Sequence, residues 1–196
     1  MNEEDIKKQL ECKNKEIYLN KLNLDLDNNV EVLVLTIDNL LSSISSDTKN
    51  KILGITESFQ NENIVKTNIN NFIEEYRLFL MSLVDNKKDN IEKLYKENND
   101  LSIYKIKIQE LNEDMKTQLN NKFNEKINNL IMEITKLYDD SFCNLRIKEY
   151  LKNIFKDNIN NKIMDIIKSR DIILLNTFNE TYLKYLDLNK NTVGVD

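Results

Sequence analysis

The sequence predicts an all-α protein, an elongated antiparallel bundle of three or four long, coiled-coil-like helices. Apolar residues recur every three or four positions over most of the 196 residues, which is the period of one helix face. The chain has no proline and only two glycines, so its composition offers little that interrupts a helix. Short clusters of Asn, Asp and Ser therefore mark the predicted helix ends.

The first predicted element is an N-terminal helix over residues 1–28, which ends at the polar cluster 27–29. Leucines at positions 19, 26 and 33 repeat every seven residues and favour helix. A competing interpretation is a β-hairpin over 22–35, because apolar and polar residues alternate on both sides of that cluster. We favour the helix, since an isolated two-stranded hairpin is marginally stable.

Residues 29–188 form the predicted bundle, and residues 189–196 a frayed C-terminal tail. The bundle contains four apolar stripes, over 37–59, 65–94, 101–137 and 147–185; the second is interrupted by Lys87. The stripe over 101–137 has ten intervals covering 36 residues, the 3.6-residue period of a nearly straight helix. Breaks are predicted at 61–63, 98–100 and 139–141, with weaker candidates at 85–90 and 158–161.

Packing, rather than helix propensity, must hold these helices. The chain has 32 asparagines and no alanine, so its intrinsic tendency to form helix is low. One stripe cannot offset the conformational entropy lost when its own helix forms. Each stripe therefore needs a facing stripe, from the same chain or from a second one. The poverty in Ala, Gly, Pro and Arg is typical of a low-GC genome.

The composition excludes several classes of active site. Without histidine there is no histidine base, no Ser-His-Asp system and no His-ligated metal, and two cysteines cannot form a four-thiolate site. The run 25–31 spaces oxygen ligands like a calcium loop, but it lacks the required glycine and final glutamate. Cys143 lies near Arg146, which would lower its pKa if the thiol were exposed; an inert thiol is the favoured interpretation. We expect no catalytic, cofactor-binding or metal-binding residue, and no enzyme.

The net charge is −5, but residues 146–170 carry a local excess of four positive charges. A basic amphipathic helix of this kind can lie on an anionic membrane surface or attract nucleic acid. An ordinary solvated face is the favoured interpretation, because Trp is absent and Arg is scarce. The candidate contacts for an anionic surface are Arg146, Lys148, Lys152, Lys156, Lys162, Lys168 and Arg170.

These observations predict a non-catalytic interaction or scaffold subunit that engages partner helices through its apolar stripes, in a homo-oligomer or a hetero-oligomer. One alternative is a peripheral membrane protein that uses the segment 146–170, and a second is an accessory subunit of a nucleic-acid-associated complex. The acidic balance argues against direct nucleic-acid binding, and we expect no small-molecule substrate. The N-terminus shows no signal peptide and no stretch is apolar enough to span a bilayer, so we expect a cytoplasmic protein with reduced thiols.

Overall fold

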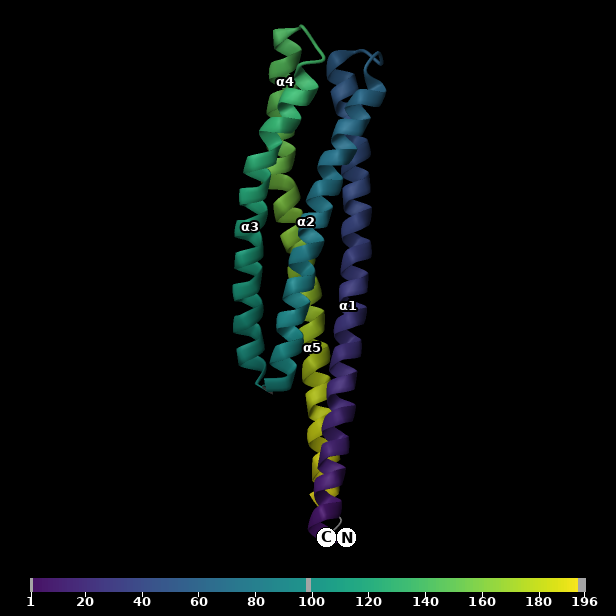
Figure 1. The fold of residues 1–196 in the computed structure, drawn as a ribbon, viewed down its shortest axis with the longest axis vertical. Coiled ribbons are helices and arrows are strands. Elements are labelled where there is room, and N and C mark those ends of the chain that lie inside the picture. The colour runs from purple at the N-terminus through teal and green to yellow at the C-terminus, as the bar shows by residue number, and fades with distance from the viewer. Residues whose placement is uncertain (1, 98–99, 194–196) are drawn as a thin grey trace.

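The computed structural model describes residues 2–97 and 100–193, which form an elongated antiparallel helical bundle (Figure 1). The helices are α1 (Glu3–Thr56), α2 (Glu62–Glu97), α3 (Leu101–Thr135), α4 (Ser141–Asn153) and α5 (Ile159–Val193). A π turn, η1 (Ile154–Asn158), joins α4 to α5, so these two helices form one rod. Within the described ranges there is no strand, which confirms the all-α prediction. The hairpin interpretation of 22–35 is wrong.

The four rods are arranged in a ring. Helix α1 packs against α2 and α5, and α3 packs against the same two helices, with α4 and η1 continuing the line of α5 (Figure 1). The lower ends of α1 and α5 extend past the connection between α2 and α3, and both chain termini lie there (Figure 1). We call residues 3–17 of α1, with residues 186–193 of α5, the stalk. In the stalk, Asn14 Nδ2 donates to Asn189 Oδ1 at 3.3 Å.

Aromatic side chains fill the core at two levels. In the half of the bundle that contains α4, Phe155 stacks with Phe123 at 6.1 Å between ring centroids and packs edge-on against Phe72 at 4.8 Å. Near the connection between α2 and α3, Phe178 meets Tyr104 edge-on at 4.3 Å. Burial in these clusters raises the pKa of four tyrosine hydroxyls well above the usual value. The four are Tyr18, Tyr76, Tyr95 and Tyr104.

Polar caps fix the helix ends. Asp100 Oδ1 accepts from the Ser102 amide at 2.8 Å, and Asp140 Oδ1 accepts from the Phe142 amide at 2.9 Å. These caps and the connections 57–61 and 136–140 confirm breaks close to the predicted ones, although positions 98–99 lie outside the described residues. Because it lies in the first connection, Phe59 is 73% exposed, although the sequence assigned it to a core stripe.

Helix α1 runs without interruption through 27–29, where the sequence predicted a break. The polar side chains there have distant partners: Asp27 pairs with Lys88 at 2.8 Å, and Asn29 Nδ2 donates to the Arg170 carbonyl at 3.0 Å. The predicted boundary between 1–28 and 29–188 therefore falls inside one helix.

Three further expectations about helix ends need correction. Helix α2 is continuous through 85–90, and the segment 158–161 belongs to the rod formed by η1 and α5 rather than to a break. Helix α5 also continues through 189–193, which the sequence assigned to a frayed tail. Residues 194–196 lie outside the described part of the chain.

The π turn resets the buried face of the last rod. From Ile147 to Ile167 the buried residues recur every fourth position, a spacing that drifts around a regular α-helix. In the π turn the Ile159 amide donates to the Ile154 carbonyl. Each residue of such a turn rotates the chain by a smaller angle than in an α-helix, so the turn compensates for the drift of the buried face. Beyond it, Leu174 is buried and Ile173 is 47% exposed, although the apolar stripe predicted over 147–185 includes Ile173 as a core position.

Candidate functional site

A layer of four polar residues crosses the apolar core of the bundle. Each of the four rods contributes one buried member: Asn29 from α1, Lys87 from α2, Asn112 from α3 and Asp171 from α5. The buried apolar residues of the core form two clusters. Along each rod, the polar member lies between a residue of one cluster and a residue of the other; Lys87, for example, lies between Val84 and Ile91. The polar layer thus separates the two apolar clusters of the core.

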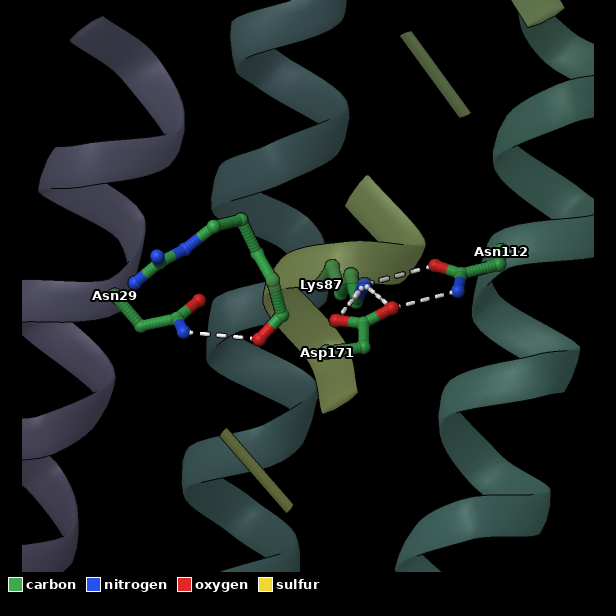
Figure 2. Close-up of polar contacts among 5 residues, drawn as sticks. Asn29, Lys87, Asn112 and Asp171 are labelled. Atoms are coloured by element: carbon green, nitrogen blue, oxygen red, sulfur yellow. Dashed lines mark hydrogen bonds and ion pairs between the residues drawn. The ribbon is translucent and has the colours of Figure 1, made fainter. Parts of the chain in front are cut away.

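An ion pair forms the centre of the layer (Figure 2). The Lys87 Nζ atom donates to Asp171 Oδ1 at 2.7 Å and to Asp171 Oδ2 at 2.8 Å. Asn112 bonds both partners, because its Oδ1 accepts from Lys87 at 2.8 Å and its Nδ2 donates to Asp171 at 2.7 Å. Asn29 joins the layer by donating to the main-chain carbonyl of Arg170, the residue before Asp171.

The members of the layer bond one another. Burial lowers the pKa of the Lys87 ammonium, while Asp171 acts in the opposite direction. The Asp171 carboxylate accepts three hydrogen bonds, two from Lys87 and one from Asn112. A buried polar contact of this kind is satisfied in one helix register only, because a shifted register would leave the charges unpaired.

One residue of this layer was already visible as unusual in the sequence. Lys87 stands at a core position of the stripe over 65–94, which is unusual for a lysine without a partner. Nothing in the sequence identifies its partner, since Asp171 lies 84 residues further along the chain. A second polar contact was missed for the same reason: the Tyr76 hydroxyl donates to Asn160 Oδ1 at 2.9 Å, and Asn160 Nδ2 donates to Asn120 at 2.7 Å.

The basic residues of 146–170 are spread along α4, η1 and α5 rather than gathered at one place. Six are exposed, whereas Arg170 is partly buried beside the polar layer. From Arg146 to Lys168 the rod rises about 33 Å at the usual 1.5 Å per residue. The Arg146 guanidinium lies 5.9 Å from the centre of the Phe142 ring, and Lys168 lines a groove between α3 and α5. The exposed members of this set are Arg146, Lys148, Lys152, Lys156, Lys162 and Lys168.

The surroundings of Cys143 are not those of a reactive thiol. Cys12 and Cys143 are both free. Burial raises the pKa of the Cys143 thiol, and Asp140 acts in the same direction, against the smaller opposite effect of Arg146. The calcium-like run lies inside α1, where Asp25 pairs with Lys21 at 2.7 Å. Across the described residues, no three His, Cys, Asp or Glu side chains are grouped to hold a metal ion.

Grooves run between the helices. The one between α1 and α2 has a volume of about 650 Å³ and is lined mostly by polar residues. Its side chains bond to one another: Arg77 Nε donates to Asp38 at 2.6 Å, and the Ser45 hydroxyl donates to Asn70 at 2.6 Å. The groove between α3 and α5 has a volume of about 550 Å³ and reaches the Asp171 side of the polar layer.

Helix α1 has a second apolar face, which points away from the bundle. At 100° per residue, five exposed apolar side chains of α1 fall within a 40° sector, opposite the buried face that contains Leu26 and Leu33. Their exposed fractions range from 45% to 60%. We call this set the outer stripe; its members are Ile6, Leu10, Ile17, Leu24 and Leu35.

The outer stripe starts in the stalk, where α1 has α5 alone as a neighbour. In the stalk Asn14 of α1 contacts Asn189 of α5, while the apolar residues Ile6, Leu10 and Ile17 of α1 are exposed. The stripe covers 30 residues from Ile6 to Leu35, or about eight helical turns. Asn28 falls in the same sector, and the charged residues Lys13, Lys21 and Glu31 lie about 40° from its centre, so the apolar residues are interrupted by polar ones.

No helix in the described ranges 2–97 and 100–193 combines the length and the apolar character needed to cross a bilayer. No family model matches this sequence, and neither the curated proteins nor the solved structures contain a match to it.

Proposed function

We propose that this protein is a non-catalytic interaction or scaffold subunit whose outer stripe on α1 binds a helix of a partner protein. The observation that supports the proposal is the alignment of five exposed apolar side chains on one face of α1, over about eight turns. Partner helices bind faces of this kind through apolar residues spaced three, four or seven apart.

The internal polar layer would serve this role by holding α1 in one register. Because Asn29 ties α1 to α5 through the Arg170 carbonyl, the helix cannot slide along the bundle without breaking a buried bond. A rigid α1 presents the outer stripe as a preformed surface, which lowers the entropy lost on binding. We place this scaffold in the cytoplasm, the compartment in which thiols such as those of Cys12 and Cys143 stay reduced.

Photocrosslinking in the cells that make the protein tests this role. A photoreactive amino acid at Leu24, in the middle of the outer stripe, is expected to form a covalent adduct with a polypeptide when the cells are irradiated. The matched control places the same amino acid at Leu78, which is 58% exposed on α2. We expect the Leu24 adduct to exceed the Leu78 adduct at least fivefold, because a bound helix covers the first site only.

The mass of the adduct identifies the type of partner, whether a second copy or a different protein. Equal adduct yields at Leu24 and Leu78, or no adduct at Leu24, would contradict the proposed function.

A further inference from the structure

We propose that the partner of the outer stripe is a second copy of this chain, with the two α1 helices packed antiparallel about a two-fold axis. This inference rests on the proposed function, since it names the occupant of the same surface. It depends on the spacing of the stripe and on the charges along its edges.

Four of the five members of the outer stripe are spaced symmetrically. The intervals from Ile6 to Ile17, from Ile17 to Leu24 and from Leu24 to Leu35 are 11, 7 and 11 residues. Two such helices, antiparallel and centred between residues 20 and 21, bring Ile6 of one copy level with Leu35 of the other. The same arrangement brings Ile17 level with Leu24. A two-fold interface requires this self-complementarity, in which each contact is made twice.

The fifth member of the stripe, Leu10, lies level with Glu31 of the second copy. Its methyl groups would pack along the aliphatic stem of that glutamate, whose carboxylate remains at the edge of the interface.

The exposed charges on one edge of the stripe also fit the antiparallel arrangement. Lys13 and Glu31 lie on the same edge, each about 40° from the centre of the stripe on a regular helix. Antiparallel helices bring matching edges together, and Lys13 then lies within about 4.5 Å, measured along the axis, of the level of Glu31 in the second copy. A parallel pair would instead place Lys13 level with Lys13, and Glu31 level with Glu31.

The opposite edge is neutral at the two-fold axis. Lys21 lies there, and its Nζ atom is already paired with Asp25 of the same helix at 2.7 Å. At the two-fold axis, each Lys21 would therefore be paired with Asp25 of its own helix, and the positive charges of the two lysines would be compensated. The antiparallel pair thus places no unmatched charge beside the buried leucines and isoleucines.

The first experiment measures the mass of the purified protein. In multi-angle light scattering over a dilution series, we expect twice the chain mass of 23.2 kDa at high concentration and one chain mass on dilution. The double variant Ile17→Asn/Leu24→Asn should raise the dissociation constant by more than about tenfold. The double variant Leu78→Asn/Ile106→Asn, which removes two apolar residues that are each 58% exposed on α2 and α3, should leave the dimer unchanged.

The second experiment determines the orientation by disulfide trapping, with Cys12 and Cys143 replaced by serine. A mixture of the single variants Ile17→Cys and Leu24→Cys should form a crosslinked dimer on oxidation, because these positions face each other. Either variant alone should not, because identical positions are then seven residues apart along the axis, about 10.5 Å, which exceeds the reach of a disulfide.

Three results would overturn this inference: one chain mass at every concentration, a dimer that the Ile17→Asn/Leu24→Asn variant leaves intact, or efficient crosslinking of either cysteine variant alone. Circular dichroism on each variant verifies that the helices are still formed. If the purified chain is monomeric while Leu24 crosslinks to a different protein in cells, the self-association fails and the proposed function stands.

Discussion

Replacing Asp171 with leucine is expected to lower the free energy of unfolding by about 3–5 kcal/mol. The change leaves the Lys87 ammonium buried, with the Asn112 side chain as its remaining partner in the layer. Urea denaturation at pH 7, followed by circular dichroism, measures the loss. The double variant Lys87→Leu/Asp171→Leu should recover most of it, because it removes the unpaired charge and fills the same space with apolar side chains.

The matched control is Asp165→Leu, an exposed aspartate on the same helix, for which we expect a change within about 0.5 kcal/mol. If Asp171→Leu and Asp165→Leu gave the same free energy of unfolding, the buried ion pair would not exist in solution.

Replacing Phe155 with alanine is the second change with a large expected effect. Phe155 is 1% exposed in the π turn and packs against Phe72 and Phe123. Its loss opens a cavity in the core and should cost about 3–5 kcal/mol. For a chain of this length, that corresponds to a fall in Tm of about 6–20 °C, which differential scanning calorimetry measures.

Phe142→Ala provides the comparison, since Phe142 is 68% exposed although it lies in the same rod. We expect its Tm to stay within about 2 °C of the unsubstituted protein, as for most surface substitutions. If the Phe155→Ala and Phe142→Ala variants had the same Tm, the rod would not be packed as described.

The apolar periodicity predicted most of the core of α3. In the stripe over 101–137, eight of the eleven predicted positions are buried, because a single regular helix carries the whole pattern. The same reasoning was less successful for the rod formed by α4, η1 and α5, because the π turn shifts the buried face by one residue from the predicted positions. No residue type signals such a turn, since it arises from how the rod packs against its neighbours.

Polar residues inside helices were the main source of error. The cluster 27–29 predicted a break, yet α1 continues because Asp27 and Asn29 find partners on α2 and α5. Lys87 was visible as an interruption of its stripe, but the layer it belongs to needs residues from α3 and α5 that only the fold brings together. The outer stripe was hidden for a related reason: the sequence shows which residues are apolar, and the fold decides which face the bundle covers.

If a partner covers the outer face of α1, a cysteine on that face is protected from labelling in living cells. In a background without Cys12 and Cys143, the variants Leu24→Cys and Leu78→Cys are treated with a membrane-permeant maleimide, and mass spectrometry measures the labelled fraction. We predict that Leu24→Cys reacts at least fivefold more slowly than Leu78→Cys in cells, and at a similar rate in dilute purified protein. Equal rates for the two cysteines in cells would contradict the proposal that a partner covers this face.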